Sequence, residues 1–190
     1  PAEIVATTVG KPLPGVEVKV VDDVGKTVGA GRPGEILVRG FNVMKEYFAN
    51  PEATRDAMDG DGWLRTGDIG FVGDDGNIRI TDRKKDMYIS GGFNVYPAEV
   101  EGFMLRHPAV AQGAVVGLPD ERMGEVGLAV VVPRSGRATD FDQAEFLQWC
   151  RDNMANYKVP RRVRVVEALP LNPSGKVMKF KLRDEAVATP

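Results

Sequence analysis

A run of charged residues from Asp82 to Asp86 divides the chain into two parts whose apolar residues follow different patterns. Before this run, short stretches of alternating apolar and polar residues are separated by turn-forming residues, which is typical of antiparallel strands. After it, segments with apolar residues at helical spacing alternate with apolar strand-like segments. We therefore expect an α+β protein of two units, a β-rich unit over 1–84 and a small α+β unit over 85–190.

The local patterns also predict the individual elements. In the first unit we expect a short helix from Pro51 with Asn50 as its N-cap, and strands over 16–21, 35–40, 63–72 and 78–80. In the second unit we expect helices from Pro97, over 141–154 and over 177–186, and strands over 87–90, 110–116, 126–132 and 162–166. Thr139 and Asp140 are the predicted caps of the helix over 141–154.

Composition excludes several classes of protein. The 190 residues include 25 Lys or Arg and 27 Asp or Glu, and 43% are hydrophobic, as in ordinary soluble domains. A single cysteine, Cys150, and a single histidine, His107, exclude a disulfide framework, a cysteine-rich zinc site and a multi-histidine metal centre. No apolar run approaches the ~20 residues of a membrane span, and no signal peptide is recognisable. We expect a cytoplasmic protein without a metal site, in which Cys150 and His107 are structural.

Charge is unevenly distributed along the chain. Residues 151–190 contain nine Lys or Arg against four Asp or Glu, whereas the preceding part is acidic. Such a basic segment suits nucleic acid, phosphate groups or an acidic partner, or it is a solvated surface. Only Tyr157 and Phe180 provide aromatic rings there, so a stacking platform for single-stranded nucleic acid is not expected.

Three glycine-containing segments are candidates for carrying chemistry. Asp68 ends a Trp-Leu-Arg-Thr-Gly-Asp segment, where a carboxylate can bind a vicinal diol such as a ribose, or can bind its own backbone in a turn. The adjacent Gly91 and Gly92 allow close approach of a ligand, or form a plain bend. Lys176 ends an Asn-Pro-Ser-Gly-Lys turn, which can deliver an ammonium group or simply expose a lysine. The spacing around it does not match a phosphate-binding loop.

Together and in this order, these segments resemble the C-terminal third of the adenylate-forming enzymes. That family includes acyl-CoA synthetases, aryl-CoA ligases, luciferases and peptide-synthetase adenylation domains. Five motifs spread over nearly the whole chain carry the resemblance: 34–47, 63–69, 82–86, 91–101 and 172–176. The resemblance implies that 1–84 end a large N-terminal domain, as part of a distorted barrel. It also implies that 85–190 form a mobile lid domain with a short central sheet flanked by helices.

The resemblance further implies a reaction and its site residues. The family joins a carboxylate to ATP to give an acyl-adenylate, then passes the acyl group to a thiol, usually that of CoA. By position, Asp68 would bind the ribose hydroxyls, Arg83 would lie near the ribose and phosphate, and Lys85 would be the hinge. Gly92 would line the channel for the pantetheine arm of CoA. Lys176 would be the catalytic lysine of adenylation.

The expected function is therefore that of the C-terminal part of an AMP-forming acyl-CoA ligase acting on a carboxylic acid, with a fatty acid favoured. The implied cofactors are ATP or AMP, CoA, and Mg brought with ATP. The implied partners are the acid and an upstream N-terminal domain, without nucleic acid. The chain opens without Met, and the family's phosphate loop and acyl pocket are missing, so the chain alone is expected to be inactive. Two alternatives stay open: an adenylation domain that loads a carrier protein, and a non-catalytic nucleotide-binding module.

Overall fold

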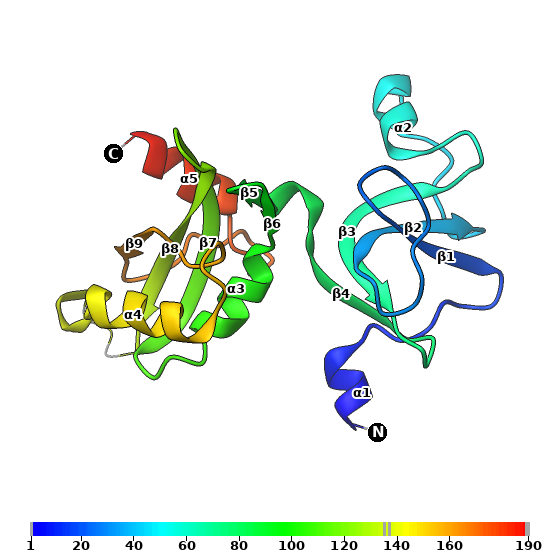
Figure 1. Ribbon diagram of the computed structural model, residues 1–190. Coiled ribbons are helices and arrows are strands. Elements are labelled where there is room, and N and C mark those ends of the chain that lie inside the picture. Colours follow the sequence, from blue (N-terminus) through cyan, green and yellow to red (C-terminus); the bar gives the residue numbers. More distant parts are fainter. Residues whose placement is uncertain (1, 135, 137, 189–190) are drawn as a thin grey trace. The chain divides into compact units, whose positions relative to one another are not determined.

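A computed structural model of the protein describes residues 2–134, 136 and 138–188, in two compact units, Pro1–Lys85 and Asp86–Pro190 (Figure 1). Both units combine helices with mainly antiparallel sheet, so the predicted α+β class is confirmed. The boundary between the units falls inside the charged run, between Lys85 and Asp86. Within the described ranges, no helix is long and apolar enough to cross a membrane.

Unit 1 is built on a four-stranded antiparallel sheet in the order β1-β2-β3-β4. Its strands are β1 (Val16–Val21), β2 (Gly34–Gly40), β3 (Leu64–Val72) and β4 (Ile78–Arg83). Two short helices accompany them, α1 (Ala2–Thr7) and α2 (Pro51–Ala57). As predicted, the Asn50 side chain caps α2 by accepting a hydrogen bond from the Ala53 N–H at 3.1 Å.

The pairing of β3 with β4 brings together two residues that are distant in the sequence. The register shifts between Ile69 and Gly70, and beyond this irregularity Asp68 lies directly opposite Arg83. Such an irregularity redirects the side chains that follow it. The end of β4, where the charged run begins, therefore lies beside the Thr-Gly-Asp segment of β3.

Unit 2 contains a five-stranded sheet in the order β6-β5-β8-β7, with β9 pairing in parallel with β8. Its strands are β5 (Tyr88–Ser90), β6 (Phe93–Val95), β7 (Val110–Asp120), β8 (Gly124–Pro133) and β9 (Arg162–Val165). Its helices are α3 (Pro97–Met104), α4 (Gln143–Asn153) and α5 (Lys179–Ala188). Short 3-10 turns lie at Lys84–Asp86, where the two units meet in the chain, and at Ala138–Asp140.

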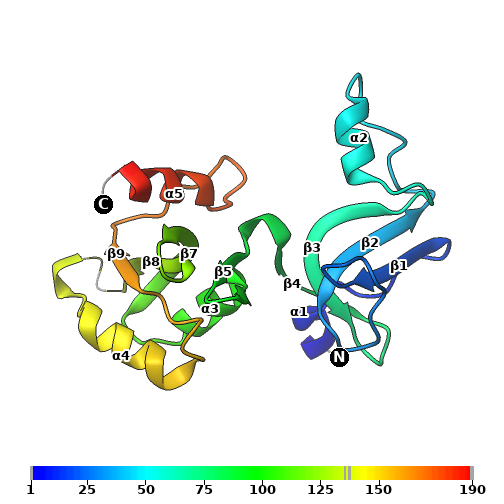
Figure 2. The ribbon, with the colours of Figure 1, turned by 45° about the horizontal axis from the view of Figure 1, so that its top comes forward.

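Helices cover both faces of the sheet of unit 2 (Figure 2). Neighbouring strand residues point to opposite faces, so Val115 packs with α3 and α4 whereas Val116 packs with Leu182 of α5. Cys150 of α4 lies in the first of these two cores and is fully buried. Burial raises the pKa of its thiol to about 11, as expected of a structural cysteine.

His107 also has the buried position expected of a structural residue. Its side chain is 2% exposed and contacts the rings of Phe146 and Trp149 edge-on, at centroid distances of 5.4 and 5.3 Å. The ring nitrogen Nδ1 accepts a hydrogen bond from the Ala109 N–H at 3.2 Å.

The predicted start of α4 was wrong. The helix begins at Gln143, because the carboxylate of Asp142 accepts hydrogen bonds from the N–H groups of Ala144 and Glu145, both at 2.9 Å. The predicted caps, Thr139 and Asp140, lie instead in the preceding 3-10 turn.

Other boundaries differ as well. The last helix begins at Lys179, because Val177 is paired with Leu171 across a turn. The strands β7 and β8 are longer than predicted and form one hairpin, and β6 and α1 were not predicted. Asp82, the first residue of the charged run, is buried near the end of β4.

Candidate functional site

Asp68 and Arg83 form an ion pair across the end of the β3-β4 pair. Arg83 Nε lies 2.7 Å from Asp68 Oδ1, and the Asp68 side chain is 20% exposed. The Asp68 N–H donates to Thr66 Oγ1 at 3.0 Å, and the Thr66 hydroxyl donates to the Ile36 carbonyl at 2.7 Å. The carboxylate is therefore held in place before any ligand binds.

Beside this ion pair lies an open pocket lined by Thr66, Gly67, Arg83, Lys84 and Lys85. Three of these five residues are cations, so the pocket suits an anionic group. A neighbouring carboxylate that can accept hydrogen bonds from a diol is the complement of a ribose carrying a phosphate.

Glu35 anchors the cationic side of this pocket. Its side chain is 7% exposed, and its Oε2 lies 2.9 Å from Lys84 Nζ and 3.2 Å from Arg65 Nη1. A carboxylate so deeply buried must be compensated by cations. The consecutive residues Arg83 and Lys84 thus bind acids on two different strands, which fixes the end of β4.

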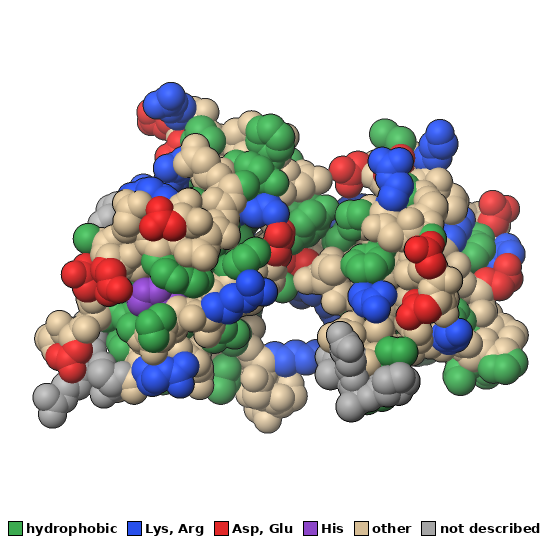
Figure 3. All heavy atoms as spheres, turned by 60° about the horizontal axis from the view of Figure 1, so that its bottom comes forward, with side chains coloured by type: hydrophobic (Ala, Val, Ile, Leu, Met, Phe, Trp, Pro, Cys, Tyr) green, Lys and Arg blue, Asp and Glu red, His purple; other side chains and the backbone are tan. Residues whose placement is uncertain are grey.

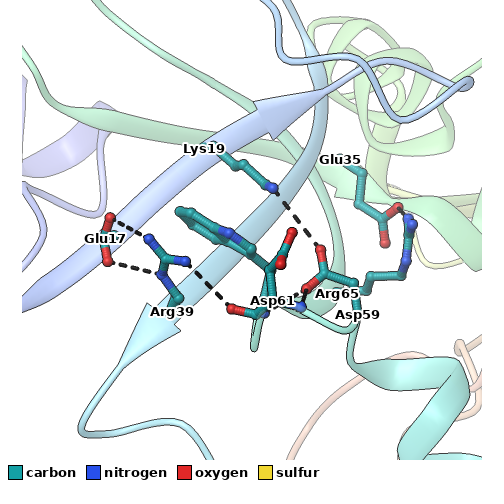
Figure 4. Close-up of polar contacts among 8 residues, drawn as sticks. Glu17, Lys19, Glu35, Arg39, Asp59, Asp61 and Arg65 are labelled. Atoms are coloured by element: carbon teal, nitrogen blue, oxygen red, sulfur yellow. Dashed lines mark hydrogen bonds and ion pairs between the residues drawn. The ribbon is translucent and has the colours of Figure 1, made fainter.

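A second cluster of polar contacts supports the start of β3 (Figure 4). The Arg39 guanidinium binds both carboxylate oxygens of Glu17 at 2.9 Å. The ring centroid of the buried Trp63 indole lies 4.2 Å from Lys19 Nζ and 4.6 Å from Arg39 Cζ. The Trp63 backbone N–H donates to Asp59 Oδ1 at 2.9 Å. These contacts hold the strand that leads into the pocket.

In unit 2, the two adjacent glycines between β5 and β6 have different surroundings. Both have positive φ, 58° at Gly91 and 85° at Gly92, which other residues rarely adopt. A Cβ at Gly91 would meet the methyl group of Met123, whereas a Cβ at Gly92 would meet nothing within 4 Å. Gly92 therefore lies at an open bend that a narrow ligand can approach.

Lys176 lies at the end of a compact turn between β9 and α5. The Asn172 Oδ1 accepts three hydrogen bonds, from Ser174 N, Ser174 Oγ and Lys176 N, at 3.0, 2.8 and 2.8 Å. The Asn172 N–H donates to the Lys176 carbonyl at 2.9 Å. The Lys176 side chain is exposed, and no hydrogen bond or ion pair of its ammonium group is found among the described residues. The backbone is thus ordered while the charge is available.

The predicted site residues divide between the two units. Asp68, Arg83 and Lys85 lie together around the pocket of unit 1. Gly92 and Lys176 lie on unit 2. Glu35 and Asn172 were missed as candidates; Glu35 stands in a Gly-Glu-Ile-Leu strand, and Asn172 begins the Asn-Pro-Ser-Gly-Lys turn. An acid in a strand and an Asn four residues before the lysine were the available signals.

No group of metal-ligating side chains is found in the part of the chain that the structure describes. The donor set around Asp68 consists of one carboxylate already paired with a guanidinium. This set fits a nucleotide better than a divalent cation.

Comparisons with known proteins agree with the resemblance seen in the sequence. Residues 99–176 match the AMP-binding enzyme C-terminal domain, and residues 2–48 match the AMP-binding enzyme family. A 3-[(3aS,4S,7aS)-7a-methyl-1,5-dioxo-octahydro-1H-inden-4-yl]propanoyl:CoA ligase of Rhodococcus jostii is 54% identical over 95% of this chain and 33% of its own length. The long-chain-fatty-acid–CoA ligase FadD13 of Mycobacterium tuberculosis is 46% identical over 82% of the chain and 30% of its own length.

Solved structures show the same relationship. ATP-bound MatB from Rhodopseudomonas palustris matches 94% of the chain with a TM-score of 0.88 and 40% identity, over 35% of its own length. The amide bond synthetase McbA from Marinactinospora thermotolerans matches 95% with a TM-score of 0.84 and 42% identity, over 36% of its own length. The chain spans about a third of the length of the curated relatives it matches. It therefore belongs to the adenylate-forming, AMP-binding enzymes and corresponds to their C-terminal portion.

Proposed function

We propose that this chain is the C-terminal part of an ATP-dependent, AMP-forming acyl-CoA ligase. The observation that carries the proposal is the Lys176 turn, whose backbone is ordered by Asn172 while its ammonium group stays exposed and unpaired in the described residues. A cation presented in this way suits a site completed by another part of the protein. The matching family domains cover residues 2–48 of the pocket-bearing unit and residues 99–176 of the lysine-bearing unit, and the second match ends at Lys176.

In this proposal unit 1 belongs to a large N-terminal domain, where its sheet is part of a distorted barrel, and its pocket holds the nucleotide. Asp68 accepts hydrogen bonds from the two ribose hydroxyls, and Arg83 orients that carboxylate and lies near the phosphate. A bidentate contact to a diol fixes the sugar, and thereby the α-phosphate, relative to the acid to be activated.

In this proposal unit 2 supplies groups that are each needed in only one half-reaction, Lys176 in adenylation and Gly92 in thioester formation. When the carboxylate attacks the α-phosphorus and pyrophosphate leaves, negative charge develops on the phosphoryl oxygens, and Lys176 stabilises it. Lys176 must then withdraw so that a thiol can reach the acyl-adenylate. We propose that Lys85, the last residue of unit 1, is the hinge of this movement. The open bend at Gly92 then faces the pantetheine arm of CoA.

The acyl acceptor and the acid are also proposals. A thiol acceptor is supported by the CoA ligases among the relatives, and a fatty acid by the long-chain-fatty-acid ligase. An amine acceptor is a second candidate, because an amide bond synthetase is 42% identical to this chain.

Mg accompanies ATP in this proposal. The cytoplasmic location expected from the sequence stays a prediction.

The surface charge bears on the choice of partner. On the face shown in Figure 3, acidic and basic side chains are interspersed on each unit. A mixed surface of this kind favours small anionic ligands at defined pockets over an extended polyanion.

The test uses the full-length parent protein and measures ATP–pyrophosphate exchange with dodecanoate and with ferulate as probe acids. Replacing Lys176 with alanine is expected to slow exchange by about 100- to 1000-fold, as when a single charge-stabilising donor is removed from an active site. Lys181→Ala is the matched control, since Lys181 is also exposed and lies five residues further along. Unchanged exchange in Lys176→Ala would contradict the proposed role, whereas equal loss in the control would point to a non-specific charge effect.

A further inference from the structure

Glu101 and Lys179 form an ion pair close to the turn that carries Lys176. Lys179 is the first residue of α5 and stands three residues after Lys176, whereas Glu101 lies in α3. Lys179 Nζ lies 2.8 Å from Glu101 Oε1, and the two side chains are only 17% and 18% exposed. The pair is therefore shielded from solvent and is not one of the weak surface pairs.

Glu101 is itself held by the sheet. Its Oε1 accepts a hydrogen bond from the Val115 N–H at 2.7 Å. Val115 lies in β7, at one edge of the sheet order, so this N–H points away from the neighbouring strand β8 and needs another acceptor. The carboxylate thus has a fixed position, set by β7, from which it binds Lys179.

This contact joins two layers of unit 2. The core residues show that α3 packs on one face of the sheet and α5 on the other. Apart from the ion pair, α5 is held to the sheet mainly by apolar residues such as Leu182 and Ala186. Apolar packing is not directional, so the half-buried ion pair is a directional contact that helps to specify where the first turn of α5 lies.

The Lys176 turn is closed directly before α5, so its position depends on the position of the start of α5. The turn is closed by the pairing of Leu171 with Val177, and the Met178 N–H donates to the Pro170 carbonyl at 2.8 Å. Asn172 makes the turn internally rigid, as described above. The position of the Lys176 backbone therefore depends on where its base, at 177–179, is held.

We propose that Glu101 and Lys179 are positioning residues for the adenylation lysine, a role that rests on the proposed function. Their ion pair sets the start of α5 and thereby aims the Lys176 turn. Neither residue is required to touch ATP or the acid. Misplacement of a reacting group by about 1 Å can cost about 100-fold in rate, so loosening this contact is expected to impair adenylation.

The experiment compares both half-reactions of the full-length parent protein, using whichever of dodecanoate or ferulate gives the faster exchange with the unmodified protein. Lys179→Met removes the charge while keeping much of the side-chain length, and Glu101→Gln removes the charge while keeping an oxygen for the Val115 N–H. Each variant is expected to slow pyrophosphate exchange at least about tenfold. Thioester formation from supplied acyl-adenylate and CoA is expected to stay close to that of the unmodified protein.

Two further variants make the test specific. Lys179→Arg restores the charge and is expected to recover most of the exchange rate, and the double variant Glu101→Gln/Lys179→Met is expected to be no slower than the worse single variant. Glu185→Gln is the control, because Glu185 also pairs from α5, at 3.8 Å to Arg164, but is 62% exposed. It is expected to leave exchange unchanged.

Equal loss of both half-reactions in Lys179→Met and Glu101→Gln, or full exchange activity in both, would overturn the positioning role. Melting curves recorded on the same samples separate loss of folding from loss of positioning. Lys176→Ala, measured in parallel, tests the proposed function separately. If Lys176→Ala retains exchange, the proposed function fails; if it alone loses exchange, only the positioning role fails.

Discussion

The candidate residues of unit 1 are bound to one another, whereas the candidate lysine of unit 2 is not. Asp68 is paired with Arg83, and Glu35 holds Lys84 and Arg65 around the same pocket. In the Lys176 turn, by contrast, the hydrogen bonds described involve the backbone and Asn172, and the ammonium group is exposed. The pocket of unit 1 is arranged to bind a ligand directly. The Lys176 turn of unit 2 is arranged to present its charge to a group outside the turn.

This difference matches the needs of a reaction with two steps. A nucleotide that stays in place through both steps benefits from residues fixed beforehand. A cation needed in only one step is better placed on an element that can leave, provided that its own backbone is ordered. The comparison predicts that substitutions in unit 1 affect both half-reactions and that substitutions around Lys176 affect the first.

The largest effect in unit 1 is expected from Asp68→Asn. This change keeps the shape of the side chain but removes the charge that pairs with Arg83 and accepts the diol hydrogen bonds. Charged hydrogen bonds are worth about 1.5–3 kcal/mol, so the KM for ATP is expected to rise about 10- to 100-fold in the full-length parent protein. Steady-state kinetics check this, and a KM within error of the unmodified value would remove Asp68 from the nucleotide site.

A smaller effect is expected from Asn172→Ala. The alanine removes the oxygen that accepts three hydrogen bonds within the turn. The turn loses order while Lys176 keeps its charge, so pyrophosphate exchange is expected to fall about tenfold, less than in Lys176→Ala. Amide hydrogen exchange at Ser174 and Lys176 is expected to accelerate. If exchange falls but those amides stay protected, Asn172 acts in some other way than by ordering the turn.

A pair of glycine substitutions sharpens the comparison within unit 2. Gly92→Ala forces an alanine into positive φ, which costs about 1–2 kcal/mol, although no neighbouring atom obstructs its Cβ. Gly102→Ala is the matched change inside α3, also with open space, and is expected to stabilise the unit by about 0.5–1 kcal/mol. Thermal unfolding of the 190-residue chain measures both. If the two variants shift the melting temperature in the same direction, the backbone argument at Gly92 is wrong.

The smallest expected effect is a pH dependence of the stability of unit 2, caused by Cys150 in one of its two cores. Because burial raises the pKa of Cys150 from 9.0 to about 11, the folded state keeps its proton where the unfolded state loses it. The contribution of this thiol is fully present below pH about 9 and is lost as pH rises towards about 11. Unit 2 is therefore expected to lose stability between pH about 9 and about 11. The Cys150→Ala variant is expected to lose less stability over the same range. Tryptophan fluorescence of the chain, which includes that of Trp149 beside Cys150, follows the unfolding of both proteins. Identical pH profiles would indicate that the thiol is not shielded in solution.

Much of the fold could be predicted from the sequence because most elements carry their own signals. Alternation in 16–21 and the Asn-Pro start of α2 are local features, and the structure places both elements where expected. The predicted start of α4 was wrong because Asp142, the residue that caps the helix, stands only two positions after the predicted cap Asp140 and carries the same side chain. β6 was missed because three residues between a glycine bend and a proline give too short a pattern.

The candidate site was predictable only in part for a similar reason. Asp68, Arg83 and Lys176 stand in motifs, so a resemblance could name them as candidates. Glu35 and Glu101 act through partners 49 and 78 positions away, which no local pattern reveals. Their contacts depend on burial and on which strands lie beside them, and these are properties of the assembled units.

The most direct test of the account measures both half-reactions for Asp68→Asn and Lys176→Ala side by side in the full-length parent protein. Lys176→Ala is expected to lose pyrophosphate exchange but still to form thioester from supplied acyl-adenylate, whereas Asp68→Asn is expected to weaken both reactions. If Lys176→Ala impairs both half-reactions equally, the lysine is part of a fixed site, and the contrast between the two units would be contradicted.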